Sequence, residues 1–262
     1  MDAERCNKIR QAVVEAGIAL AHSSMTVGTY GNISCRIDET HIAITPSGRD
    51  YEQLAPADIV VTDMEGTVLD CGTALANRDL SNKTFVPDPI NSTDPICSKE
   101  DGSSPGIPLR PSSELPLHLE IYKSFPEAQA VVHTHSIYAS ALAVAHRDLP
   151  PVIEDLTQIV GGTVRCTEYT IAGTKEMGKR AVEAMEGRRT AALLANHGAV
   201  CWGRNLKEAL ATAQILEKGA QIYYIARSFG TPFPLNEKTV RVLRDFYLNH
   251  YSKRQQGEEE HE

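Results

Sequence analysis

The sequence predicts an α/β domain with a central, mostly antiparallel sheet and helices on its faces. Helical and strand-like patterns are mixed along the 262 residues without strict alternation. The strand-like segments are short, and several follow one another directly, which is typical of antiparallel pairing. The length is sufficient for a full hydrophobic core, and we expect a single domain over residues 1–262.

In the first half, apolar residues recur at roughly helical spacing over residues 3–22, which predicts a helix. The glycine-rich GTYG turn then leads into the strand NISCRI, and HIAI forms the next strand. Residues 59–69 contain two strands joined by a Glu-Gly turn. A helix is predicted over residues 114–124, with a Pro-Ser-Ser run marking its start.

In the second half, AVVHTH is predicted to be a buried strand, and SIYASALAVAH a helix that leaves it. PPVIEDLTQIVGG is expected to be a linking stretch. A helix over residues 174–186 is capped by Thr174. RRTAALLANHGAVCWG contains two strands around a turn, and residues 206–228 and 236–250 form the last two helices.

Residues 72–110 differ from the rest, because they are rich in Pro, Ser, Asn, Asp and Gly and show no periodicity. We expect a loop insertion here, either a surface excursion or a lid over the site that begins at Ser112. A polar C-terminal tail is expected at about residues 252–262.

Composition excludes several classes of protein. The net charge of -8, without a basic stripe, argues against a nucleic-acid binder. No apolar run reaches the roughly 18 to 20 residues that cross a bilayer, and the N-terminus lacks the apolar region of a signal peptide. We therefore expect a soluble, cytoplasmic protein whose six scattered cysteines are reduced thiols.

Three histidines and one glutamate are candidate metal ligands. His133 and His135 are two residues apart on a predicted strand, so their side chains point to the same face. His197 follows another apolar strand, and Glu114 begins a helix. Such a set suits a catalytic divalent cation, with Zn²⁺ as the default and Mn²⁺ or Co²⁺ as alternatives. The competing interpretation is that each is an ordinary surface, turn or helix-start residue.

Glycine- and hydroxyl-rich turns are candidate anion-binding sites, because their backbone N–H groups can approach a ligand closely. Ser112 and Ser113 also stand at a predicted helix N-terminus, where the helix dipole favours phosphate. The other candidates lie in GTYGNIS and TPSG: Gly28, Thr29, Gly31, Asn32, Ser34, Thr45, Ser47 and Gly48.

The ordered set GTYGNIS, TPSG, SSELPLHLEIY, AVVHTHS and ANHG resembles the class II aldolase family, from about residue 5 to about residue 250. The resemblance implies a three-layer α/β/α fold, a homotetramer with active sites between subunits, and one divalent cation per subunit. It implies His133, His135 and His197 as metal ligands, and Glu114 as an acid that approaches the metal and transfers protons. The implied phosphate-binding residues are Thr29, Gly31, Asn32, Ser47, Gly48, Ser112 and Ser113.

The sequence departs from this family at one place. Aldolases of this kind have a tyrosine, supplied by the neighbouring subunit as proton donor, in the segment that matches PPVIEDL. Here Glu154 or Asp155 occupies the position. Tyr251 is the counterpart of a second family tyrosine near the C-terminus. These three residues are the remaining catalytic candidates.

The resemblance predicts a metal-dependent aldolase that splits a deoxyketose 1-phosphate into dihydroxyacetone phosphate and an aldehyde. The substrates we expect are L-fuculose 1-phosphate, 5-deoxyribulose 1-phosphate and 5-methylthioribulose 1-phosphate. Two alternatives use related chemistry: a 4-epimerase similar to L-ribulose-5-phosphate 4-epimerase, and a decarboxylase of a phosphorylated keto-acid. A third, a non-catalytic adducin-type protein, is disfavoured because such relatives typically lack the ligand histidines, which this chain has.

Overall fold

A computed structural model of the chain describes residues 2–70 and 109–252. The expected loop insertion at 72–110 lies outside these residues except for 109 and 110, and the expected tail lies outside them except for residue 252. Most predicted elements are present. The helices are α1 (Ala3–His22), α2 (Leu115–Ser124), α3 (Ile137–Val144), α4 (Glu154–Val160), α5 (Lys175–Met185), α6 (Leu206–Phe229) and α7 (Glu237–Phe246).

Seven strands form one sheet in the order β4-β3-β2-β1-β5-β7-β6, and each neighbouring pair is antiparallel. The strands are β1 (Asn32–Arg36), β2 (His41–Ile44), β3 (Val60–Asp63), β4 (Val68–Asp70), β5 (Ala130–Thr134), β6 (Ala191–Leu194) and β7 (Gly198–Gly203). β5 lies near the middle, between β1 and β7, although β1 is far from it in sequence. The predicted antiparallel sheet is therefore confirmed.

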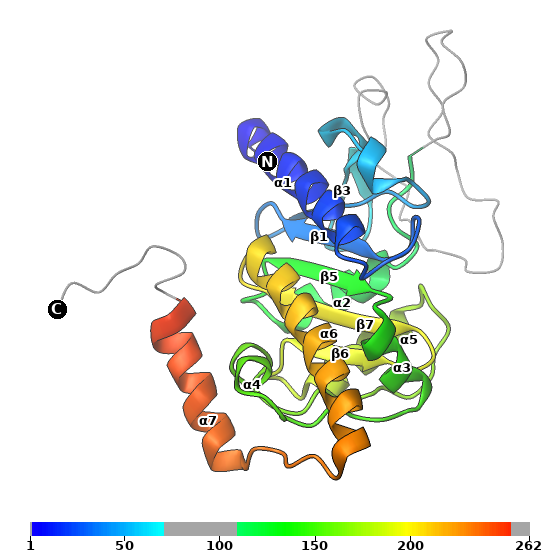
Figure 1. Cartoon of the computed structure of the whole chain (residues 1–262). Coiled ribbons are helices and arrows are strands. Elements are labelled where there is room, and N and C mark those ends of the chain that lie inside the picture. The colour runs from blue at the N-terminus through cyan, green and yellow to red at the C-terminus, as the bar shows by residue number, and fades with distance from the viewer. Residues whose placement is uncertain (1, 71–108, 253–262) are drawn as a thin grey trace, which may run out of the picture.

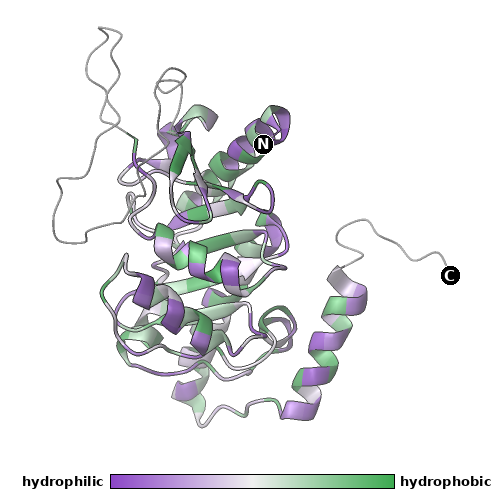
Figure 2. Ribbon diagram, turned by 180° about the vertical axis from the view of Figure 1, so that it is seen from behind, coloured by the Kyte–Doolittle hydropathy of each residue, from purple (hydrophilic) through white to green (hydrophobic). Residues whose placement is uncertain are grey.

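Side chains alternate between two cores, one on each face of the sheet. On β1, Ile33 and Cys35 belong to the core shared with α1, α3, α4 and α6. On β5, Val131 belongs to the other core, which is shared with α2 and α5. Figure 1 shows α1 and α6 in front of the sheet, and Figure 2 shows the opposite face. The result is the three-layer α/β/α arrangement, whose register is fixed because both faces are buried.

The segment predicted to be a linking stretch was interpreted wrongly, since it contains the helix α4. No side chain caps its start at Ile153, and its end depends on Gly161 in the left-handed conformation, with φ of 90°. α4 packs against α6 and α7, with Leu156 in the core. Its stability comes from tertiary packing, which a seven-residue helix needs and which local sequence does not reveal.

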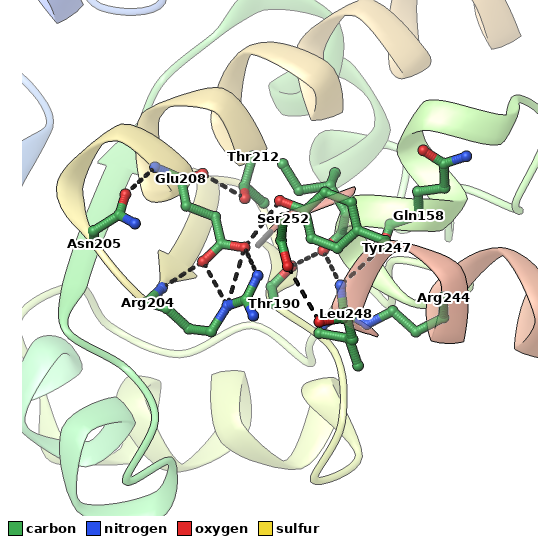
Figure 3. A network of polar contacts seen from close by, with 11 residues as sticks. Gln158, Thr190, Arg204, Asn205, Glu208, Thr212, Arg244, Tyr247, Leu248 and Ser252 are labelled. Carbon is green, nitrogen blue, oxygen red and sulfur yellow. Dashed lines mark hydrogen bonds and ion pairs between the residues drawn. The ribbon is translucent and has the colours of Figure 1, made fainter. Parts of the chain in front are cut away.

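The C-terminal helix α7 buries none of its own residues and is attached largely through polar contacts. Arg244 donates to the backbone carbonyls of Gln158 and Ile159, at 2.8 and 2.6 Å, at the end of α4. Tyr247, in the π-helical turn that follows α7, donates its hydroxyl to Glu208 of α6 at 2.9 Å. Figure 3 shows this network from close by. Among the described helices, none is long and apolar enough to cross a membrane.

Candidate metal centre

The three histidines are placed by β5 and by the turn between β6 and β7. His133 is on the same face of β5 as Val131, which points toward α2, and is fully buried. His135 follows the end of β5 and is partly exposed. His197 lies in a three-residue turn in which Asn196 adopts the left-handed conformation, with φ of 56°. Because β5 and β7 are paired antiparallel, the end of β5 and the start of β7 lie side by side, so these segments meet.

The ring nitrogens of the three histidines converge. His133 Nε2 is 2.9 Å from His135 Nε2 and 3.0 Å from His197 Nε2. The potential ligand atoms of all three lie within 4.8 Å of one another. His133 on β5 and His135 just after it therefore point to the same place, as predicted. His197 joins them from the turn between β6 and β7.

Glu114 brings a carboxylate to the same point. Its Oε2 is 3.0 Å from His133 Nε2, and its Oε1 is 2.9 Å from His197 Nε2. It precedes α2 but its side chain makes no capping bond there, and only 6% of the residue is exposed. Glu114 therefore stands at the start of a helix, but its carboxylate turns toward the histidines instead of capping that helix.

The orientation of His133 makes this arrangement suited to a cation. Its Nδ1 donates to the carbonyl oxygen of Ala199 at 2.9 Å, so the neutral ring carries its proton on Nδ1 and has a lone pair on Nε2. That lone pair faces the Glu114 carboxylate and two other imidazoles. A cation placed between these atoms would satisfy the lone pair of His133 and the charge of Glu114 together. Three imidazoles with one carboxylate fit a divalent cation.

The pKa values of the cluster follow from burial and mutual contact. Burial lowers the pKa of His133, and burial with the neighbouring His133 lowers the pKa of His135 to about 4. Burial alone would raise the pKa of Glu114, but the contacts with His133, His197 and Asn32 outweigh it and hold that pKa well below its usual range. The site therefore presents an ionised carboxylate beside His133 and His135, whose burial disfavours the charged imidazolium form.

Asn32 and Gly31 form the wall beside Glu114. Asn32 is opposite His133 in the pairing of β1 with β5, and its amide donates to Glu114 Oε2 at 2.7 Å. Gly31 has φ of 78°, and a Cβ at this position would lie 2.8 Å from the His133 carbonyl oxygen. Only glycine fits such a close backbone approach. The side chain of Asn32, predicted to bind phosphate, is thus engaged with Glu114.

The other candidate phosphate-binding loops also meet near Glu114. The backbone N–H of Ser47 donates to Arg110 O at 2.9 Å, and that of Ser112 donates to Thr45 O at 3.0 Å. The hydroxyl of Ser112 accepts from the backbone N–H of Glu114 at 3.2 Å. The exposed members of the candidate set are Thr29, Ser47, Gly48 and Ser113.

Three predicted catalytic residues are not part of this cluster within one chain. Glu154 and Asp155 begin α4, and Asp155 forms an ion pair with Lys218. Tyr251 follows α7, is 46% exposed, and its ring lies near that of Tyr247. Figure 1 shows α4 and α7 on the side of the molecule away from α3, which begins next to His135.

The sequence interpretation missed His118, a fully buried residue that contacts Asn32. It also placed Ser34 among anion-binding candidates, whereas the Ser34 hydroxyl contacts His118 and Tyr122. A signal existed, since His118 and Tyr122 are four residues apart on one helix face, and Asn32 and Ser34 are two apart on one strand face.

Comparisons with known proteins agree with these features. The sequence profile of the family "Class II Aldolase and Adducin N-terminal domain" matches residues 11–224. The chain is 35% identical to a 5-deoxy-D-ribulose 1-phosphate aldolase of Bacillus thuringiensis serovar kurstaki, covering 90% of this chain and 93% of that protein. It is 27% identical to the L-fuculose phosphate aldolase of Escherichia coli K12, covering 92% and 94%. A solved structure of an L-fuculose 1-phosphate aldolase superposes with a TM-score of 0.75 at 30% identity, covering 92% and 96%.

Proposed function

Since the chain belongs to the class II aldolase and adducin N-terminal domain family, we propose that it is a divalent-metal-dependent ketose-1-phosphate aldolase. The substrates we propose are 5-deoxyribulose 1-phosphate, L-fuculose 1-phosphate and 5-methylthioribulose 1-phosphate, which split into dihydroxyacetone phosphate and an aldehyde. Relatives with these substrates in their names match nearly the whole chain. The observation that carries the proposal is the convergence of three imidazoles and one carboxylate on one point.

His133, His135 and His197 would hold the cation, with Zn²⁺ as the first choice and Mn²⁺ or Co²⁺ as alternatives. Because imidazole ligands are neutral, a cation held there would keep its full charge and would supply the Lewis acidity needed to polarise a ketone and to stabilise the negative charge left by carbon–carbon cleavage. The fixed tautomer of His133 supports this role, since its Nδ1–H is already bonded to Ala199 O.

Glu114 is the proposed acid and base. Its carboxylate lies at the histidine cluster and is ionised, so it can take a proton in one step and return it to carbon in another. Asn32 holds one carboxylate oxygen by a 2.7 Å hydrogen bond, which limits the orientations of the group. Such positioning matters because proton transfer requires a defined distance and direction.

The phosphate group is proposed to bind the loops around Glu114. Thr29, Ser47, Gly48 and Ser113 are exposed there, and Gly31, Asn32 and Ser112 complete the set. Backbone N–H groups at these turns and at the start of α2 suit an anion. Binding the phosphate away from the reacting carbons would orient the substrate.

We propose that the active protein is a homotetramer whose sites lie between subunits. Glu154 and Asp155 lie in α4 and Tyr251 follows α7, and Figure 1 shows these helices away from α3, so we expect the three residues to serve the site of a neighbouring subunit. A mixing experiment tests this. Hybrids assembled from His133→Ala and Tyr251→Phe chains should show higher turnover than either parent. A fully active monomer would contradict the proposal.

The experiment for the activity is a coupled assay of dihydroxyacetone phosphate release. Metal-loaded protein is offered the three ketose 1-phosphates above, with and without a chelator. Release that the chelator abolishes is expected, fastest with one of the three. If none of the three ketose 1-phosphates yields dihydroxyacetone phosphate although the metal is bound, the aldolase proposal fails. Ribulose 5-phosphates and phosphorylated keto-acids then become the next substrates to test.

A further inference from the structure

We propose that His118 is a positioning residue for Glu114, acting through the side chain of Asn32. This inference rests on the proposed function, because it assigns Glu114 the proton transfers of that reaction. Among the described residues, the side-chain hydrogen-bond partners of His118 are Asn32 and Ser34.

Four side chains form a continuous chain of hydrogen bonds that ends at Glu114. Tyr122 Oη is 2.9 Å from Ser34 Oγ, which is 2.6 Å from His118 Nδ1. His118 Nε2 is 2.5 Å from Asn32 Oδ1, and Asn32 Nδ2 is 2.7 Å from Glu114 Oε2. The residues come from β1 and α2, whose facing side chains meet beneath the sheet.

Every bond in this chain has one allowed direction. An ionised carboxylate only accepts, so Asn32 must turn its NH₂ group toward Glu114 and its oxygen toward His118. That oxygen accepts, so His118 carries a proton on Nε2. In the neutral ring Nδ1 then accepts from the Ser34 hydroxyl, which leaves the Ser34 oxygen to accept from Tyr122. All the donors therefore point toward Glu114.

Burial makes each hydrogen bond in this chain costly to lose. His118 and Ser34 are fully buried, and the pKa of His118 is lowered to about 3 by burial and by His133, so the ring is neutral. In such surroundings an unpaired polar group is costly, and aligned hydrogen bonds polarise one another. Without the Nε2–H of His118, the oxygen of Asn32 would have no donor, and the amide could rotate away from Glu114.

The first test uses His118→Leu, which removes both bonds, and His118→Gln, which keeps a donor and an acceptor. In metal-loaded protein we expect His118→Leu to lower kcat about 10- to 100-fold with KM changed less than about threefold. Metal content should stay at the wild-type value, and His118→Gln should recover most of the loss. Lys123→Ala, at an exposed position of the same helix outside this chain of hydrogen bonds, is the control and should keep kcat within about threefold.

A double-mutant cycle separates positioning from a general structural role. His118→Leu should have far less effect on kcat in a Glu114→Gln background than in the wild type, because the group it positions is already neutralised. An equal fold-loss in both backgrounds would overturn the proposal. The proposal would also be overturned if folded His118→Leu protein had the same kcat as the wild type.

A measurement that needs no activity keeps the inference independent of the proposed function. In protein labelled with ¹⁵N-histidine, NMR shifts should show His118 as the Nε2–H tautomer. A His118 ring protonated on Nδ1 alone would overturn the proposed chain of hydrogen bonds. This test uses wild-type protein, so it remains possible if the His118 variants fail to fold. If wild-type protein cleaves no ketose 1-phosphate but the tautomer is as expected, the proposed function fails and the buried chain of hydrogen bonds stands.

Discussion

Glu114, which is buried, and Glu208, which is partly buried, are two glutamates with very different surroundings. Glu208, in α6, receives a forked contact from Arg204, with its Oε1 2.6 Å from Nη2, and a hydrogen bond from Tyr247. Glu114 has no such partner, since both of its ion-pair contacts within the described chain are to histidines. In both cases burial would raise the carboxyl pKa, and the contacts outweigh it and lower that pKa.

The difference shows how a structural carboxylate can be distinguished from a functional one. Arg204 carries a permanent charge, so Glu208 is neutralised by the fold itself and its network is complete (Figure 3). The partners of Glu114 are the imidazoles of His133 and His197, neither of which carries a permanent charge, so the charge of its carboxylate remains available to a cation. The following experiments test this contrast, starting with the largest expected effect.

His133→Ala should abolish both stoichiometric metal and cleavage, because His133 contacts the other two histidines and Glu114. We expect turnover to fall by at least about a thousandfold. Metal content is measured by elemental analysis, and turnover by dihydroxyacetone phosphate release. His22→Ala, at an exposed residue on α1, is the control and should keep both. Retained metal in His133→Ala would remove it from the ligand set.

Glu114→Gln should keep most of the metal but lower turnover by roughly two to four orders of magnitude, because an amide cannot transfer the proton. Kinetics on the metal-loaded variant provide the measurement. Near-normal turnover would show that Glu114 is not the acid and base. Glu114 and Glu208 would then not differ in function.

Glu208→Gln should have the opposite profile. Turnover and metal content should stay close to wild type, whereas the free energy of unfolding should fall by about 1–3 kcal/mol, because Arg204 loses its ionised partner. Chemical denaturation measures this. A large loss of turnover with unchanged stability would mean that the network in Figure 3 serves the active site directly.

Tyr247→Phe removes one hydrogen bond to Glu208 and leaves the Arg204 contact in place. We expect a loss of about 1 kcal/mol in the free energy of unfolding, with metal content unchanged. If stability were unaffected, the attachment of α7 would depend on Arg244 and its carbonyl partners instead.

Acid should reduce the contribution of Glu208 to stability. Its folded pKa is lowered, so its contribution is present above the unfolded value of about 4.3 and is lost as the pH falls through the folded pKa. The stability difference between wild type and Glu208→Gln should therefore narrow below about pH 4. A difference that stays constant down to pH 3 would contradict a lowered pKa.

Most of the fold could be predicted from the sequence because its elements have local signals. α1 was predicted with the bounds Ala3–His22, and Thr174 caps α5 as expected. α4 was missed because it is short, begins without a capping side chain and follows two prolines. Its contacts with α6 and α7 stabilise it as a helix.

The candidate site was predictable where its residues follow the ends of strands, and not where it depends on the register between strands. His133, His135 and His197 were all predicted, and the structure brings them together. The bond from Asn32 to Glu114 depends on Asn32 facing His133, a pairing between segments a hundred residues apart. The spacing of His118 and Tyr122 was a local signal, but the contact of His118 with Asn32 depends on how α2 packs against β1, which local sequence does not reveal.

The most direct test of the account is a metal titration of chelator-treated protein, with bound Zn²⁺ and dihydroxyacetone phosphate release measured on the same samples. We expect turnover to rise in proportion to bound metal and to reach its plateau at one cation per chain, with no recovery in His133→Ala. Full turnover in metal-free wild-type protein, or a plateau that His133→Ala also reaches, would contradict the claim that this cluster is a catalytic metal centre.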